Sequence, residues 1–141
     1  MTHEATPPIE TIMMVDDEEV DQMLYGRIVE RSDHAKRIVS FQDAKKALTH
    51  LVDASEPVPE LVLLDVNMPN MDGFGFLSEL ATKMDNASAP IIVMLTTSFN
   101  PADEKRAREF DLVHGFRNKP LTDGMLGEFR QMVAEIGRSA A

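Results

Sequence analysis

Short runs of apolar residues recur along the chain at the length of β-strands. Four are strong and the last is weaker, and they span residues 12–15, 38–41, 61–64, 91–95 and 112–116. Their apolar residues are continuous rather than alternating, which is typical of strands that are covered on both faces. The runs therefore predict a parallel sheet with helices on either side.

Between and after these runs, apolar residues repeat at intervals of three or four, the spacing of one helix face. The spacing predicts helices with apolar faces at Val20, Leu24 and Ile28; at Ala44, Leu48 and Leu51; at Phe74, Leu77 and Leu80; and at Met125, Phe129, Met132, Val133 and Ile136. Another helix is expected to begin at Asn100 and Pro101, because asparagine caps helices and proline suits the first helical position. The alternation predicts an α/β fold with a doubly wound five-stranded parallel sheet.

The length of 141 residues is that of one ordinary domain, which we expect to span residues 11–138. Residues 1–10 contain two prolines and no apolar stretch, so they are expected to form a disordered tail rather than a signal peptide. Residues 139–141 are expected to form a short C-terminal tail. Because the chain stops directly after the last predicted helix, we expect no attached output domain.

Charge and cysteine content exclude several classes of function. Asp and Glu number 24 against 14 Lys and Arg, and the formal net charge of −10 repels a nucleic-acid backbone. The chain has no cysteine, which excludes disulfides, thiolate zinc sites and thiol catalysis and fits a reducing compartment. The apolar runs are too short to span a bilayer. The sequence thus predicts a cytoplasmic protein that binds neither membranes nor nucleic acid.

Polar and charged residues follow four of the five predicted strands. Asp16 and Asp17 follow the first run, Asp65 the third and Thr96 the fourth, and Lys119 lies just beyond the fifth. In a doubly wound sheet with strand order 2-1-3-4-5, functional side chains gather at the carboxyl ends of the strands. Asp17 and Asp65 are then expected to lie close enough to share one ion. Carboxylate oxygens are hard ligands that select Mg²⁺ or Mn²⁺ over zinc.

A carboxylate beside a divalent ion, a hydroxyl and an ammonium group can form and break an aspartyl phosphate. In that chemistry Asp65 attacks phosphorus, the metal and Lys119 neutralise the equatorial oxygens, and Thr96 donates a hydrogen bond. Each residue alone also has a structural interpretation, such as acids at a helix N-terminus, an Asx turn or a solvated lysine. Their joint occurrence at the predicted strand ends favours the chemical interpretation.

Five motifs complete this pattern: Met14-Val15-Asp16-Asp17-Glu18, Leu63-Leu64-Asp65-Val66-Asn67-Met68-Pro69, Met71-Asp72-Gly73, Leu95-Thr96-Thr97 and Asn118-Lys119-Pro120. Over residues 12–137 the chain resembles a CheY-like response regulator receiver domain of two-component signalling. The resemblance implies a flavodoxin-like (βα)5 fold with strand order 2-1-3-4-5. The segments Leu95-Thr96-Thr97-Ser98 and Phe110-Asp111-Leu112-Val113 resemble those of free-standing regulators partnered with phytochrome-type sensor kinases.

The resemblance implies a role for each candidate site residue. It makes Asp65 the phosphoacceptor, Asp17 a direct metal ligand, Asp16 an acid that holds the metal through water, and Asn67 the donor of a backbone carbonyl to the metal. It makes Thr96 the switch hydroxyl, Lys119 the phosphate partner, and Phe116 the aromatic residue whose burial follows phosphorylation. The Lys119–Pro120 bond is expected to be cis, as the matching bond often is in the family.

The function implied by the resemblance is a switch rather than an enzyme with an external substrate. A sensor histidine kinase, a histidine phosphotransfer protein or a small phosphodonor phosphorylates Asp65 with Mg²⁺ bound, and the chain catalyses only its own phosphorylation and dephosphorylation. Movement of Thr96 and Phe116 then remodels the protein-binding face of the fourth helix, fifth strand and fifth helix. We expect a monomer or a phosphorylation-dependent dimer with a downstream protein partner.

Two other interpretations stay open on the sequence. A phosphatase or phosphotransferase with a nucleophilic aspartate normally has a second catalytic Asp two residues later, where this chain has Asn67. A receiver-like module that binds partners without phosphorylation usually lacks one of the acids, the threonine or the lysine, and all of these are present here.

Overall fold

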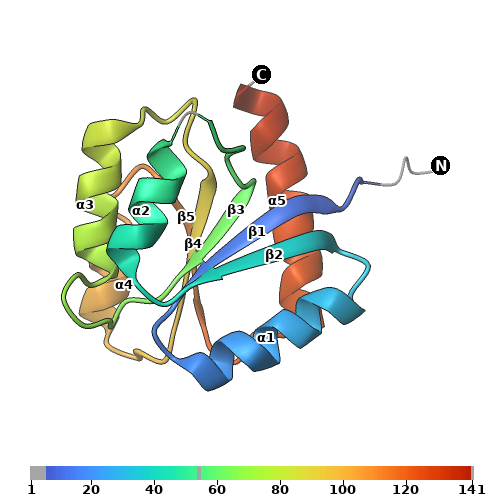
Figure 1. Cartoon of the computed structure of the whole chain (residues 1–141), viewed down its shortest axis with the longest axis horizontal. Helices are drawn as coiled ribbons and strands as arrows, with labels where there is room; N and C mark the ends of the chain where they lie inside the picture. Colours follow the sequence, from blue (N-terminus) through green and yellow to red (C-terminus); the bar gives the residue numbers. More distant parts are fainter. Residues whose placement is uncertain (1–5, 54, 141) are drawn as a thin grey trace.

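The computed structural model describes residues 6–53 and 55–140, in which strands and helices alternate along the chain (Figure 1). The strands are β1 (Ile9–Val15), β2 (Ala35–Phe41), β3 (Leu61–Leu64), β4 (Ile91–Thr96) and β5 (Val113–Asn118). The helices are α1 (Glu19–Arg31), α2 (Ala44–Val52), α3 (Gly73–Lys83), α4 (Pro101–Ala107) and α5 (Asp123–Ala140). All strand pairs are parallel, and the order β2-β1-β3-β4-β5 confirms the predicted doubly wound sheet.

Helices cover both faces of this sheet. α1 and α5 lie on one face, and α2, α3 and α4 lie on the other (Figure 1). Alternate residues of β1 belong to different clusters: Met13 and Val15 pack with α2 and α3, whereas Ile12 and Met14 pack with α1 and α5. The strand is apolar at each of these positions because both of its faces are buried.

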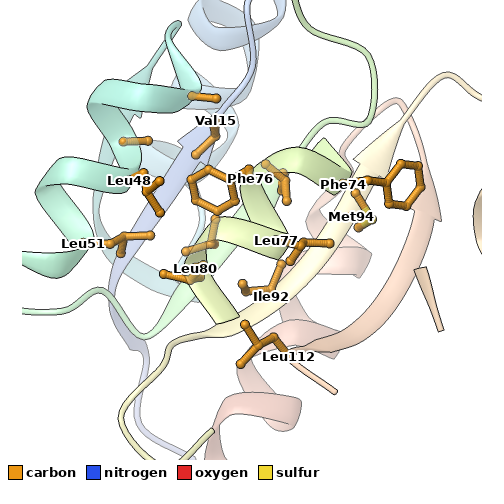
Figure 2. Packing of buried hydrophobic residues seen from close by; sticks show 14 of the residues in the cluster. Val15, Leu48, Leu51, Phe74, Phe76, Leu77, Leu80, Ile92, Met94 and Leu112 are labelled. Atoms are coloured by element: carbon orange, nitrogen blue, oxygen red, sulfur yellow. The ribbon is translucent and has the colours of Figure 1, made fainter. Parts of the chain in front are cut away.

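The larger apolar cluster lies between α2, α3 and the sheet (Figure 2). Phe76, Leu77 and Leu80 of α3 are fully buried there, and Leu48 and Leu51 of α2 pack into the same cluster. Each such side chain contributes roughly 1.5–3 kcal/mol when it is fully buried. The apolar faces predicted for these two helices are therefore confirmed, and their burial holds both helices against the sheet.

The apolar face predicted for α1 is wrong at two of its three positions. Val20 and Leu24 are 61% and 47% exposed, whereas Tyr25 and Val29 are buried. Gln22, on the same helix face as Tyr25 and Val29, donates its side-chain amide to two main-chain carbonyls at the ends of β1 and β2. These hydrogen bonds hold the face of α1 that carries Gln22 toward the sheet, because an apolar side chain there could not donate to the Asp16 and Phe41 carbonyls.

The sheet begins earlier than predicted, so the expectation of a disordered tail over residues 1–10 is wrong at its end. Residues 1–5 lie outside the described part of the chain, but Ile9 and Glu10 belong to β1, and Ile9 is buried. Ile9 pairs in register with the first residue of β2. The extension was hidden in the sequence because Glu10 and Thr11 interrupt the apolar run.

The chain also continues its secondary structure later than predicted at two places. α5 includes residues 139 and 140 of the expected C-terminal tail, since neither is a glycine or proline that would stop a helix; residue 141 lies outside the described part. β5 extends beyond its apolar run because Arg117 and Asn118 pair with Leu95 and Thr96 through their backbones. Neither α5 nor any other described helix is both long and apolar enough to cross a bilayer.

Gly73, the first residue of α3, lies against the backbone that carries Asp65. A Cβ atom built at Gly73 would come within 2.4 Å of the Asp65 carbonyl oxygen and 2.9 Å of the Met94 side chain. By contrast, a Cβ atom built at Gly26 in α1 would have no neighbouring atom within 4 Å. The two helical glycines therefore differ sharply in the space around them.

We expect Gly73→Ala to lower the free energy of unfolding by about 2 kcal/mol, because the added methyl group forces packed backbone segments apart. Gly26→Ala is expected to raise it by about 0.5–1 kcal/mol, because alanine favours a helix interior more than glycine does. Urea denaturation followed by circular dichroism measures both values. Equal effects of the two substitutions would contradict the close approach at Gly73.

Candidate functional site

Three candidate site residues, Asp16, Asp65 and Lys119, each directly follow a strand and continue its main-chain hydrogen bonding to the neighbouring strand. The backbone N–H of Asp16 donates to the last residue of β2 at 3.0 Å, and that of Asp65 donates to the last residue of β1 at 3.0 Å. The backbone N–H of Lys119 donates to Thr96 at the end of β4 at 2.9 Å. These side chains therefore start from fixed positions at one edge of the sheet, formed by the carboxyl ends of the strands.

Three carboxylates meet at this edge. Asp16, Asp17 and Asp65 each offer an oxygen atom, and these oxygens lie within 4.8 Å of one another. Asp16 and Asp65 are buried and Asp17 is partly buried. Such close like charges repel one another unless a cation lies among them, and carboxylate oxygens suit Mg²⁺ or Mn²⁺. The side chains present fit a divalent cation.

The two oxygens of each buried carboxylate have different partners. One oxygen of Asp16 accepts a hydrogen bond from the backbone N–H of Glu18 at 2.9 Å, and the other lies 2.7 Å from Nζ of Lys119. One oxygen of Asp65 accepts from the backbone N–H of Val66 at 2.8 Å, and the other lies 3.6 Å from the same Nζ. The backbone thus orients both carboxylates toward the lysine.

Burial and pairing act against each other in the electrostatics of this cluster. Burial raises the pKa of Asp16 above its ordinary value, and hydrogen bonds from Lys119 and from the Glu18 backbone offset only part of that rise. Burial acts to lower the pKa of Lys119, but hydrogen bonds to Asp16 and Asp21, together with the negative charges of Asp65 and Asp16, outweigh burial and raise that pKa above its ordinary value. Lys119 therefore stays charged at neutral pH.

Thr96 is fully buried at the end of β4, and its hydroxyl oxygen accepts a hydrogen bond from the backbone N–H of Ser98 at 3.2 Å. The Ser98 hydroxyl donates to the carboxylate of Asp103 in α4 at 2.5 Å. The side-chain amide of Asn118 donates to the Ser98 carbonyl at 2.6 Å. Ser98 thus links the buried hydroxyl of Thr96 to α4 and to the end of β5.

Asn67 and Phe116 are the remaining residues predicted for the site. Asn67, two residues after Asp65, is exposed, and Phe116 in β5 is partly buried against the larger apolar cluster. The roles expected for these two residues stay predictions. The Lys119–Pro120 bond is cis, as expected.

Two residues of the site were missed by the sequence analysis. Oδ2 of Asp21 lies 2.8 Å from Nζ of Lys119, and Gln22 holds the carbonyl of Asp16 through its side chain. Asp21 follows Asp17 by four residues, one turn of the predicted helix, and this spacing was a signal that both acids could reach the same strand edge. Gln22 has no such signal, because its partners are main-chain atoms.

We expect Lys119→Met to lower the free energy of unfolding by about 3 kcal/mol at pH 7.5, because it leaves buried carboxylates without their cation. A carboxyl group whose pKa is raised by folding destabilises the folded protein when it is ionised, that is, at the higher pH. The stability lost in Lys119→Met should therefore be smaller at pH 5 than at pH 7.5, because the lower pH favours protonation of Asp16. Urea denaturation at the two pH values measures this.

Lys36→Met is the matched control, because Lys36 pairs with Glu10 at the surface and both side chains are more than half exposed. Its effect should stay below about 1 kcal/mol at either pH. A deficit for Lys119→Met that did not depend on pH would contradict the electrostatic explanation.

Comparison with known proteins agrees with this geometry. The sequence profile of the response regulator receiver domain matches residues 12–128. Response regulator Rcp1 from Synechocystis sp. is 33% identical over 107 residues, which are 73% of this chain and 71% of that protein.

Solved structures share the fold. A two-component response regulator from Cytophaga hutchinsonii superposes with a TM-score of 0.82 at 23% identity, covering 91% of this chain and 98% of that one. The Mn²⁺-bound form of response regulator Rcp1 superposes with a TM-score of 0.68 at 27% identity, covering 92% of this chain and 91% of that one.

Proposed function

The chain belongs to the response regulator receiver domain family of two-component signalling, and from that premise we propose that Asp65 is its phosphoacceptor. The observation that carries the proposal is the set of charges around Asp65. Two further carboxylates lie within 4.8 Å of its own, and the ammonium group of Lys119, a buried side chain, lies 3.6 Å away. This combination suits a nucleophile that must accept a phosphoryl group, because cations are needed to neutralise the charge on the phosphoryl oxygens.

A divalent cation, Mg²⁺ or Mn²⁺, is part of the proposal. Asp17 and Asp65 would ligate it directly, Asp16 through water, and Asn67 through its backbone carbonyl. When bound, the cation supplies positive charge to the oxygens of the phosphoryl group. The Mn²⁺-bound form of the relative Rcp1 supports a cation of this class here.

The chemistry needs one reactive oxygen on Asp65. One oxygen is held by the backbone N–H of Val66, which leaves the oxygen that faces Lys119 to attack phosphorus. A new bond forms between that oxygen and phosphorus, while the bond from phosphorus to a histidine nitrogen of the donor breaks and its electron pair stays on the imidazole. Lys119 then pairs with a phosphoryl oxygen, because its ammonium group already lies beside the acceptor.

The switch that follows uses Thr96 and Phe116. Movement of the Thr96 hydroxyl toward the phosphoryl group breaks its hydrogen bond with the Ser98 N–H. The Ser98 hydroxyl is hydrogen-bonded to Asp103 of α4. The space that Thr96 leaves lets Phe116 turn inward. Both movements change the face formed by α4, β5 and α5, where a downstream protein binds.

The donor in this proposal is a sensor histidine kinase, a histidine phosphotransfer protein or a small phosphodonor, and the reaction takes place in the cytoplasm. The chain acts on no external substrate and catalyses only its own phosphorylation and dephosphorylation. The phosphorylated protein is a monomer or a dimer that forms on phosphorylation.

We expect the intact mass of the protein to increase by one phosphoryl group after incubation with acetyl phosphate and Mg²⁺. Asp65→Asn should abolish the increase, because an amide oxygen is a poor nucleophile, and a chelator should abolish it in the unchanged protein. Mass spectrometry of the whole protein measures this. The control is Asp43→Asn, which removes the charge of the residue that caps α2 while asparagine keeps the cap, and this variant should be phosphorylated normally.

Phosphorylation that persisted in Asp65→Asn would move the acceptor to another residue. No phosphorylation of the unchanged protein by acetyl phosphate or by a histidine kinase would contradict the proposal and favour a module that binds its partners without phosphorylation.

Mg²⁺ at one hundred times its dissociation constant should raise the free energy of unfolding by about 2.7 kcal/mol, because only the folded chain holds the three carboxylates together. Asp17→Asn should remove this gain and yet raise the stability of the metal-free protein by about 1 kcal/mol, because it removes one of three close like charges. Thermal and urea denaturation with and without Mg²⁺ measure both effects. Asp33→Asn, at an exposed position, should change neither.

A further inference from the structure

Lys119 is held by carboxylates from three different parts of the chain. Its Nζ atom lies 2.7 Å from Asp16 after β1, 2.8 Å from Asp21 in α1, and 3.6 Å from Asp65 after β3. Asp16 and Asp65 also belong to the three-carboxylate cluster, and Asp21 does not. Asp21 is thus a partner of the lysine that has no place in the proposed cation site.

The three carboxylates do not lie equally close to the ammonium group of Lys119. Asp16 and Asp21 lie at hydrogen-bond distance from it, whereas 3.6 Å to Asp65 is too long for a normal hydrogen bond. The side chain of Lys119 is only 5% exposed, so water screens these interactions weakly. In this arrangement Asp21 draws the ammonium group toward α1 and away from the phosphoacceptor.

We propose that Asp21 is a positioning residue that neutralises part of the Lys119 charge, and thereby strengthens cation binding at the three carboxylates while weakening phosphoryl binding at Asp65. The inference rests on the proposed function of Asp65 and adds a residue that tunes it.

The effect on the cation follows from the sign of the charges. An unshared ammonium group beside Asp16 and Asp65 repels a divalent cation and competes for the same carboxylate oxygens. Asp21 gives that ammonium group another carboxylate and adds one more negative charge near the site. Removing the charge of Asp21 therefore weakens cation binding.

The effect on the phosphoryl group is opposite. A phosphoryl group on Asp65 brings additional negative charge to a site that already contains several acids. Lys119 is the side-chain cation beside Asp65, and its attraction for the phosphoryl oxygens is greatest when no other acid shares it. Removing the charge of Asp21 therefore strengthens phosphoryl binding once the cation site is full.

A matched control for this charge is available in the same turn of the same helix. Glu19 and Asp21 are both acids in the first turn of α1, where either stabilises the helix through its dipole. Asp21 bonds to Lys119, and Glu19 is exposed to solvent. Glu19→Gln thus repeats the change in net charge and in helix stability while the lysine keeps its partner.

The experiment compares the unchanged protein with Asp21→Asn, Asp21→Glu and Glu19→Gln. Isothermal titration calorimetry measures the affinity for Mg²⁺ alone, and then the affinity for beryllofluoride, a phosphoryl mimic, at saturating Mg²⁺. Asp21→Asn should weaken Mg²⁺ binding about three- to tenfold and tighten beryllofluoride binding by about the same factor. Asp21→Glu should restore part of both affinities, and Glu19→Gln should change each by less than about twofold.

A second readout follows the lysine itself. The nitrogen and proton signals of the Lys119 ammonium group, assigned with Lys119→Met, should shift or broaden in Asp21→Asn and stay unchanged in Glu19→Gln. Opposite changes of the two affinities support the proposal, because general damage to the site would weaken both.

Two results would overturn the inference. If the unchanged protein binds both probes and Asp21→Asn weakens both or changes neither, Asp21 is only a structural residue and the proposed function of Asp65 survives. If the unchanged protein does not bind beryllofluoride at saturating Mg²⁺, the proposed function fails and the inference fails with it.

Discussion

The rest of the site depends on the ion pairs of one buried ammonium group. Lys119 lies among carboxylates that follow β1 and β3 and one that belongs to α1, so a single cation joins three parts of the chain at one edge of the sheet. Without it, burial would drive the acids to take up protons. A protonated carboxyl group is a poor metal ligand and a poor nucleophile. The interaction that makes these charges compatible with folding therefore also keeps them chemically useful.

Concentrating so many charges at one edge is possible because the apolar core is elsewhere. One cluster packs α2 and α3 on the sheet, and a second packs α1 and α5 on its other face. Both contain residues of β1, β3 and β4, so the central strands are held from two sides while their carboxyl ends stay free for polar groups. The sheet thus separates the apolar residues that stabilise the fold from the charged residues of the candidate site.

The end of β4 connects the site to the surface. Thr96 is buried beside the site, and its hydroxyl is bonded to Ser98, which in turn bonds to Asp103 in α4 and to Asn118 at the end of β5. In the proposed switch, movement of the Thr96 hydroxyl would break its hydrogen bond with the Ser98 N–H. In that switch, a rearrangement at the site therefore reaches α4 and β5 through hydrogen bonds whose geometry is specific, rather than through the tightly packed core.

The sequence by itself determined the α/β class, the parallel sheet, and the gathering of Asp16, Asp17, Asp65, Thr96 and Lys119 at its edge. These features are local, since a continuous apolar run predicts a buried strand and the residues after it lie at its carboxyl end. The start of β1, the rotation of α1 and the contact of Asp21 with Lys119 were decided only by the tertiary structure. Ile9 depends on pairing with β2, Gln22 on main-chain carbonyls of two strands, and Asp21 on a lysine 98 residues away. Such contacts follow from strand register and helix rotation, which leave no periodic pattern in the sequence.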